Sequence, residues 1–321
     1  MTRILKVNPI NPEKNKILSA VRILKKGGIV AFPTETVYGL GANAFNDKAV
    51  KKIFLAKNRP LDNPPIIHIH SIEQLKHLVK QIPPTAEKLI QKFWPGPLTI
   101  ILKKSRTISD FVTTGLDTIA IRMPKNKIAL ELIKQAGFPI AAPSANLSGK
   151  PSTTSASHVI HDLKGKVDMV LDGGSSEIGL ESTVISLVGE PILLRPGKIS
   201  KEEIEEVIGK IKVHPAVLGR PVKKALSPGM KYRHYAPEAE LILVQNAEKI
   251  PELKEKFESQ GKKVAILEIK KLEKSAKELF NKLREFDSKG FDVILSEVPK
   301  KEGIGLAIFN RLIKASNKFV S

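Results

Sequence analysis

The feature that most constrains the fold is a break in the sequence pattern between residues 209 and 237. This stretch has little hydrophobic periodicity, and helix- and strand-breaking residues recur along it at Pro215, Gly219, Pro221, Pro228, Gly229 and Pro237. Such a composition is typical of a connection between domains. We therefore predict two domains, residues 1–208 and residues 238–321, joined by a linker over residues 209–237. The length of 321 residues agrees with two domains.

Residues 1–208 alternate short apolar runs with amphipathic stretches in an irregular order. Apolar runs predict buried strands at 28–32, 66–70, 98–102, 118–122, 140–142, 169–171, 183–187 and 192–194. Helical spacing predicts helices at 15–26, 47–57 with Asp47 as N-cap, 85–93, 128–135, 157–163 and 201–208. Three prolines make residues 59–65 a loop. The irregular order favours an α/β domain with a twisted mixed sheet.

Residues 238–321 have a more regular pattern. Strands are predicted at 241–244, 264–269 and 293–297, with helices at 248–260, at 273–286 and from about residue 305. This βαβαβα order predicts parallel strands and a small Rossmann-like, three-layer α/β domain. No Gly-x-Gly-x-x-Gly opens a helix here, so the pattern does not support dinucleotide binding.

The charge of the chain is strongly asymmetric. Lys and Arg number 53 against 33 Asp and Glu, a formal net charge of +20. Residues 1–236 carry +17 of it and residues 237–321 carry +3. A positive domain attracts polyanions such as RNA or nucleotide phosphates, but a lysine-rich solvated surface has the same composition. Both interpretations stay open at this point.

Several classes of protein are excluded. The chain has no cysteine, which excludes disulfides, zinc fingers and thiol catalysis. Its content of 41% hydrophobic and 27% charged residues is that of a folded globular protein. We find no apolar run long enough to span a bilayer and no secretory signal, so we expect a cytoplasmic location.

Common catalytic motifs are also missing: the sequence contains no P-loop, no His-Glu-x-x-His and no Gly-x-Ser-x-Gly. Polar segments instead lie at the ends of predicted strands, where open α/β sheets bind ligands. Each of them can also be an ordinary loop. They are residues 33–40 (PTETVYGL), 57–68 (KNRPLDNPPIIH), 142–152 (APSANLSGKPS), and 172–183 with 195–197.

Taken together, these segments resemble the YrdC family. PTETVYGLG, KNRPLDNP, WPGPLT, APSANLSGKPSTT, ESTV and LRPG stand in the family's order, and SPGMKYRHYAP at 227–237 is similar to the linker of its long, two-domain form. Pro65 departs from the pattern, since the family more often has Leu there. The resemblance covers nearly the whole chain. It implies a YrdC-like catalytic domain with a basic cavity.

The implied activity is that of an L-threonylcarbamoyladenylate synthase, a nucleotidyltransferase. Such an enzyme uses L-threonine, bicarbonate and ATP and releases pyrophosphate. Its product feeds the threonylcarbamoyladenosine modification of tRNA beside the anticodon. The implied partners are these substrates and the downstream threonylcarbamoyl transferase machinery, with a possible tRNA contact and no membrane. Mg²⁺ is expected as cofactor, bound mainly through the ATP phosphates, with its protein ligands unknown.

The resemblance also implies roles for individual residues. The family's Lys-x-Arg and Ser-x-Asn motifs fall on four catalytic candidates, Lys57, Arg59, Ser144 and Asn146. The implied L-threonine site consists of Thr36, His68, Arg122, Ala142 and Ser182. The implied ATP site consists of Arg59, Asn63, Thr118, Ser144, Ser152, Arg195 and Tyr235.

Physical chemistry agrees with these roles. Arg122 at a strand end offers a bidentate partner for the threonine carboxylate. Lys57 and Arg59 can stabilise the negative charge that develops on the carbamate and pyrophosphate. Because no nucleophile is required, positioning supplies much of the rate. His68 is either a base or a neutral hydrogen-bond partner. Tyr235 lies in the linker, which we expect to close over ATP as a lid.

Two other functions stay open. The positive charge suits an RNA-binding or ribosome-associated module without turnover, although aromatic residues make up only 5% of the chain and no RNA-recognition motif occurs. A carbamoyl transferase with another acceptor would share the same cavity and chemistry. Threonine-dependent turnover of ATP distinguishes the three.

Overall fold

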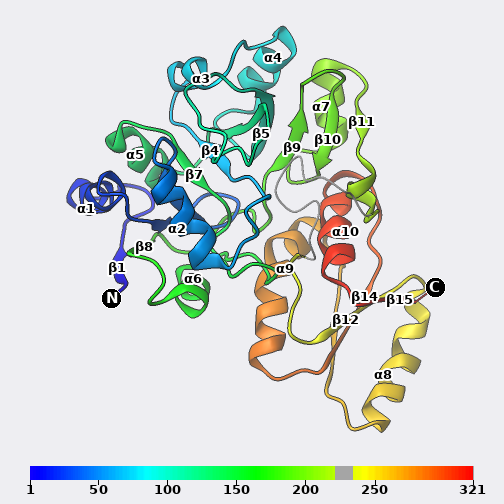
Figure 1. Ribbon diagram of the computed structural model, residues 1–321. Helices are drawn as coiled ribbons and strands as arrows, with labels where there is room; N and C mark the ends of the chain where they lie inside the picture. Colours follow the sequence, from blue (N-terminus) through cyan, green and yellow to red (C-terminus); the bar gives the residue numbers. More distant parts are fainter. Residues whose placement is uncertain (221–233, 321) are drawn as a thin grey trace.

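The fold is described from a computed structural model, which covers residues 1–220 and 234–320 (Figure 1). Two sheets organise it, one of eleven strands formed before residue 214 and one of four strands formed after residue 239. No helix within these residues is long and apolar enough to cross a membrane.

The large sheet is mixed, as predicted. Its spatial order is β1-β8-β2-β3-β7-β4-β6-β5-β9-β10-β11. Pairs such as β4–β6 and β5–β9 are parallel, whereas β4–β7 and β5–β6 are antiparallel. The strands are β1 (Arg3–Lys6), β2 (Val30–Phe32), β3 (Gly39–Asn43), β4 (Ile66–His68), β5 (Leu98–Lys103), β6 (Thr118–Arg122), β7 (Ile140–Ala142), β8 (Met169–Asp172), β9 (Thr183–Ser186), β10 (Ile192–Arg195) and β11 (Lys212–Val213).

Helices cover both faces of this sheet. Side chains alternate along a strand, so Val30 and Phe32 of β2 pack in one core cluster while Ala31 packs in another. The first cluster includes α1 (Lys14–Lys25) and α5 (Lys127–Ala136). The second includes α2 (Asp47–Lys57), α3 (Ile72–Leu78), α4 (Pro84–Phe93), α6 (Ala156–Leu163) and α7 (Lys201–Ile208). A 3₁₀ helix, η1 (Pro215–Leu218), follows β11.

The small sheet has the predicted parallel, three-layer arrangement. Its order is β13-β14-β12-β15, and every pair is parallel. On one face lies α8 (Ile250–Ser259); on the other lie α9 (Leu272–Ser288) and α10 (Gly303–Ala315). The strands are β12 (Glu240–Val244), β13 (Val264–Leu267), β14 (Val293–Glu297) and β15 (Lys318–Val320), and a 3₁₀ helix, η2 (Ala247–Lys249), precedes α8.

Some details differ from the sequence-based predictions. The strand predicted over 28–32 begins at Val30, and the strand predicted over 66–70 ends at His68. Asn46, not Asp47, is the N-cap of α2, because its side chain accepts a hydrogen bond from the Ala49 amide at 3.1 Å. The predicted linker contains β11, which pairs with β10, and η1. Residues 221–233 of that linker lie outside the described residues.

Candidate active site

Loops at the strand ends enclose a small cavity. Its wall includes Thr36 and Tyr38 after β2, Arg59 after α2, Ser144 after β7, and Ser182 before β9. Hydrogen bonds fasten two of these loops together: the Tyr38 amide donates to the Thr153 carbonyl, and the Ala145 amide donates to the Tyr38 carbonyl, each at 2.8 Å. The loops thus form one continuous wall. The free volume inside it is about 40 Å³, far below the roughly 300 Å³ of a usual ligand pocket.

Nine of the fourteen predicted site residues line this cavity: Thr36, Arg59, His68, Arg122, Ala142, Ser144, Ser182, Arg195 and Tyr235. The other five lie in or behind its wall or at a distance: Lys57, Asn63, Thr118, Asn146 and Ser152. Thr118 is the most remote of them. It begins β6 while Arg122 ends it, and it lines a separate hollow beside Pro64 and Thr113.

Arg122 sits at the carboxyl end of β6 and is 3% exposed. Its Nη1 donates to the Thr36 hydroxyl at 2.8 Å and its Nε to the Gly96 carbonyl at 3.2 Å. Its Nη2 lies 2.7 Å from a carboxylate oxygen of Glu35. The guanidinium therefore already engages a carboxylate, with a hydroxyl beside it.

Lys57 is placed differently from the phosphate-binding role that the sequence suggests. It ends α2, is 1% exposed, and donates through Nζ to the main-chain carbonyls of Ser144, at 2.6 Å, and Asn146. Burial, followed by the charge of Arg59, holds the pKa of Lys57 well below its ordinary value. The ammonium thus holds the Ser-x-Asn loop from behind.

Arg59 turns into the cavity because the chain reverses at Asn58, whose φ of 51° lies in the left-handed region. Its Nε donates to the Asn63 carbonyl at 3.0 Å and its Nη2 to the Pro64 carbonyl at 3.3 Å. Burial lowers the pKa of Arg59 to about 10, so the side chain stays charged at neutral pH. Asn63 supports Arg59 through its main chain.

Ser144 and Asn146 shape the loop that Lys57 holds. The Ser144 hydroxyl donates to the Asn146 side-chain oxygen at 2.5 Å. The Asn146 amide group donates to the carbonyls of Leu147 and Lys150 at 2.7 and 3.0 Å. Ser144 faces the cavity, and Asn146 braces the loop behind it.

Arg195 also lines the cavity. Its Nε and Nη2 donate to the carbonyl and hydroxyl of Ser182, each at 3.0 Å. The Ser182 hydroxyl also lies 2.7 Å from the Thr99 hydroxyl. Gly197 permits this close approach, because a Cβ there would lie 2.4 Å from the Thr183 amide nitrogen. With Arg59 and Arg122, Arg195 makes the cavity basic, as expected from the sequence.

Comparison with known proteins assigns the family. Residues 22–197 match the Sua5/YciO/YrdC family, which is described as telomere recombination. Residues 199–317 match the threonylcarbamoyl-AMP synthase C-terminal domain. The chain belongs to the Sua5/YciO/YrdC family. The chain matches both the catalytic and the C-terminal family models, as the long, two-domain form does. This confirms the family resemblance that was found from the sequence.

Individual relatives agree. A threonylcarbamoyl-AMP synthase of Pyrococcus abyssi is 57% identical over 261 residues, which are 79% of this chain and 77% of the relative. One from Bacillus subtilis is 52% identical over 78% of this chain and 73% of its own length. The solved structure of P. abyssi Sua5 complexed with L-threonine superposes with a TM-score of 0.96 at 51% identity, covering 99% of each chain. The fold class and the long-form architecture are therefore those of this family.

Sequence reasoning missed two ionisable residues of the cavity wall of this Sua5/YciO/YrdC member. Glu181 and His234 line the cavity and are 5% and 8% exposed. Each directly precedes a predicted site residue, Ser182 or Tyr235, within a motif recognised from the sequence. Their place in those motifs was the available signal. Burial, followed by the charge of Arg59, lowers the pKa of His234 to about 3, so it is neutral at pH 7.

His68 is also neutral at pH 7. Burial and the adjacent Arg122 guanidinium lower its pKa to about 3. Its Nδ1 lies 3.2 Å from the Ile66 carbonyl, which can only accept a hydrogen bond. Of the two roles that the sequence left open, this geometry favours the neutral hydrogen-bond partner.

The residues of the cavity do not form a metal site of their own. Within residues 1–220 and 234–320, no three His, Asp or Glu side chains are grouped to hold an ion. The carboxylates beside the cavity, Glu35 and Glu181, are each paired with an arginine, Arg122 and Arg311. The Mg²⁺ expected from the resemblance stays a prediction.

Proposed function

We propose that this chain joins L-threonine, bicarbonate and ATP into L-threonylcarbamoyladenylate, with release of pyrophosphate and water. The observation that supports this most is the buried cavity in which Arg59, Arg122 and Arg195 converge beside serine hydroxyls. It occurs in a fold that superposes on a relative complexed with L-threonine. We further propose that the product serves tRNA modification beside the anticodon. Location in the cytoplasm and contact with tRNA stay predictions.

In this proposal Arg122 and Thr36 bind the amino-acid carboxylate. Arg122 already contacts the Glu35 carboxylate through Nη2 and the Thr36 hydroxyl through Nη1. The carboxylate of the substrate would accept a charge-assisted hydrogen bond from Nη1 and a second hydrogen bond from the Thr36 hydroxyl. This arrangement holds the amino nitrogen of L-threonine in the cavity, where it forms a bond to the carbon of bicarbonate; a C–O bond breaks, the leaving oxygen takes a proton from the nitrogen and departs as water, and a carbamate remains.

Arg59 and Arg195, which both line the cavity, then bind the phosphates of ATP. The carbamate oxygen attacks the α-phosphorus; the bond from this phosphorus to the oxygen that bridges it to the β-phosphate breaks, and pyrophosphate leaves with that oxygen and the electron pair. Two fixed guanidinium groups in a buried site stabilise the negative charge of that transition state without having to reorganise. Mg²⁺ accompanies ATP as part of the substrate, held by phosphate oxygens and water.

The proposal includes a moving part. His234 and Tyr235 line a cavity with a free volume of only about 40 Å³, which is too small for the substrates together. The Ala236 amide donates to the Gly149 carbonyl at 2.8 Å and anchors these residues beside the Ser-x-Asn loop. We infer that the end of the linker moves aside to admit substrates and closes again over ATP.

The test is pyrophosphate release from ATP in the presence of bicarbonate and Mg²⁺, with L-threonine, with L-serine and without amino acid. Release that needs both bicarbonate and L-threonine supports the proposal. Folded protein that binds RNA in a salt-sensitive way but releases no threonine-dependent pyrophosphate would favour the RNA-binding alternative. Hydrolysis of carbamoyl phosphate would instead point to a carbamoyl transferase.

A further inference from the structure

The C-terminal domain takes part in the wall of the catalytic cavity. Its helices α9 and α10 lie against the catalytic domain on the side of β9 and β10 (Figure 1). Val37, Leu180 and Tyr235, which come from the catalytic loops and the linker, belong to the same apolar cluster as Phe280 of α9 and Leu312 of α10. The loop before β9 also lies against α9, since a Cβ on Gly179 would be 2.1 Å from the Lys277 carbonyl oxygen.

One charged side chain of α10 reaches through this contact. Arg311 is 1% exposed and is among the largest fully buried side chains in the part of the chain that the structure describes. Its Nε donates to a Glu181 carboxylate oxygen at 2.7 Å, and its Nη1 donates to the Pro196 carbonyl at 2.9 Å. One guanidinium therefore joins the ESTV loop to the LRPG loop, 130 and 115 residues away in sequence.

Glu181 connects Arg311 to the proposed ATP site, because it contacts both Arg311 and Ser152. Its second carboxylate oxygen accepts a hydrogen bond from the Ser152 hydroxyl. Burial by itself raises the pKa of Glu181, but the charges of Arg311 and Arg195 outweigh burial and leave that pKa below its ordinary value. Glu181 is thus a buried carboxylate, and Arg311 is the cation in direct contact with it.

Arg311 also contacts the residue that closes the cavity. Its guanidinium carbon lies 5.4 Å from the centroid of the Tyr235 ring, within the range of a cation–π contact. The Tyr235 ring stacks on Phe280 of α9 with 5.2 Å between centroids. Tyr235 has a φ of 66°, a left-handed conformation that costs energy for this residue type. The contacts from α9 and α10 hold it in that conformation.

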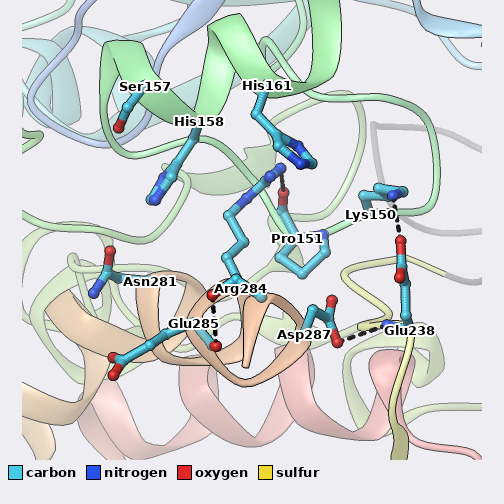
Figure 2. A pocket seen from close by; sticks show the side chains of 11 residues that line it. Lys150, Pro151, Ser157, His158, His161, Glu238, Asn281, Arg284, Glu285 and Asp287 are labelled. Atoms are coloured by element: carbon cyan, nitrogen blue, oxygen red, sulfur yellow. Dashed lines mark hydrogen bonds and ion pairs between the residues drawn. The ribbon is translucent and has the colours of Figure 1, made fainter. Parts of the chain in front are cut away.

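A second arginine of this domain provides a contrast. Arg284 of α9 donates to both oxygens of Asp162, at 3.0 and 2.7 Å, and to the Pro151 carbonyl. Figure 2 shows Arg284 reaching across a separate cavity of about 500 Å³ toward Pro151 and the helix that carries His161. Arg284 fastens the two domains outside the catalytic cavity, whereas Arg311 contacts two residues that line it.

We propose that Arg311 is a positioning residue of the adenylate-forming site, acting through Glu181 and Tyr235 on the ATP side of the cavity. The C-terminal domain then completes the site of its own chain. This inference rests on the proposed function. It predicts a defect in ATP use that is larger than any defect in L-threonine use, because the Arg122 side of the cavity has no contact with Arg311 in the described residues.

The experiment compares Arg311→Met and Arg311→Lys with the wild type and with Glu273→Gln. The Glu273→Gln control removes an exposed ion pair between the domains, Lys198 to Glu273 at 2.7 Å, and neither of these residues lines the cavity. The readouts are kcat and KM for ATP and for L-threonine in threonine-dependent pyrophosphate release, and the melting temperature. Binding of ATP is measured as well, without turnover.

We expect Arg311→Met to raise KM or Kd for ATP by about tenfold or more, since one lost charge-assisted contact changes binding by about that factor. KM for L-threonine should change less than about twofold and Glu273→Gln should resemble wild type. Arg311→Lys should recover most of the melting temperature but not the ATP affinity, because an ammonium cannot donate in the fork that joins Glu181 and Pro196.

The proposal is overturned if folded Arg311→Met or Arg311→Lys binds ATP as wild type does. It is also overturned if KM for both substrates rises together with a lower melting temperature, which indicates general loosening. If the wild-type protein released no pyrophosphate in response to L-threonine, the proposed function would be refuted. The comparison of ATP binding between wild type and the Arg311 variants would still decide the role of Arg311. In a Glu181→Gln background the effect of Arg311→Met should shrink, because the two residues act as one unit.

Discussion

Replacement of Lys57 by methionine distinguishes two roles for this residue. The sequence suggests a cation that grips the phosphates of ATP, whereas the structure places its ammonium against the carbonyls of Ser144 and Asn146. Methionine has a similar length and removes only the donor. A scaffold lysine and a phosphate-binding lysine therefore predict different outcomes for the same change.

The size of the effect follows from these contacts. Each hydrogen bond from a charged donor contributes about 1.5–3 kcal/mol, and the cost of burying the ammonium offsets part of the total for two. We expect Lys57→Met to lower the free energy of unfolding by about 3 kcal/mol, which corresponds to a melting temperature lower by about 5–10 °C. Because the Ser144 loop loses its support, kcat should fall about 100-fold, the usual effect of misplacing a site by about 1 Å.

The assay is threonine-dependent pyrophosphate release at varied ATP, together with thermal unfolding. Lys52→Met is the matched control: Lys52 also lies on α2 and donates to a carbonyl, that of Gly27 at 2.7 Å, but it is exposed and distant from the cavity. It should keep wild-type kinetics and melting temperature. A rise in KM for ATP in Lys57→Met with unchanged stability and kcat would refute the scaffold role.

Three further outcomes are expected. Arg122→Lys should raise KM for L-threonine about tenfold or more, measured in the same assay, because it loses the fork that contacts Thr36 and Gly96; an unchanged KM would contradict the carboxylate role. Acid should destabilise the fold through His68: the unfolded state binds a proton below about pH 6.5 and the folded state only near pH 3, so stability falls as pH drops between these values. Between pH 7 and pH 5, the free energy of unfolding measured in urea should fall by about 2 kcal/mol less in His68→Asn than in wild type. An equal fall in both proteins would count against the buried neutral ring. Gly197→Ala should cost about 1–3 kcal/mol of stability and reduce activity, because the added methyl meets main-chain atoms; a variant with wild-type melting temperature and kinetics would show that the loop yields freely.

The regular C-terminal domain was the most predictable part of the fold. Its apolar strands and amphipathic helices follow each other with clear changes of period, and the structure has the predicted parallel sheet. The sequence also missed β1, α3 and β15, and two further missed strands lacked that local signal. β3 (GLGAN) contains two glycines, which disfavour strands, and β11 has two residues; both form because a neighbouring strand offers them hydrogen bonds.

The proposed active-site cavity was predictable where motifs are continuous in the sequence. Nine of the predicted site residues line it, because most of the motifs lie in loops at the ends of strands of one sheet; Arg59 instead follows α2, and Ser182 precedes β9. The direction of an individual side chain was not predictable. Lys57 and Arg59 are two residues apart, yet the left-handed turn at Asn58 sends Lys57 behind the Ser144 loop and Arg59 into the cavity.

By itself, the sequence determined the family, the two-domain organisation and the polar segments at the strand ends, since all of these are written in local pattern and order. Only the tertiary structure decided which charges are paired. Arg311 stands in an apolar helix segment, GIGLAIFNRLIKA, and its partner Glu181 is 130 residues away. Because a buried charge depends on neighbours brought together by packing, no local pattern identifies either the pair or its contact with Tyr235.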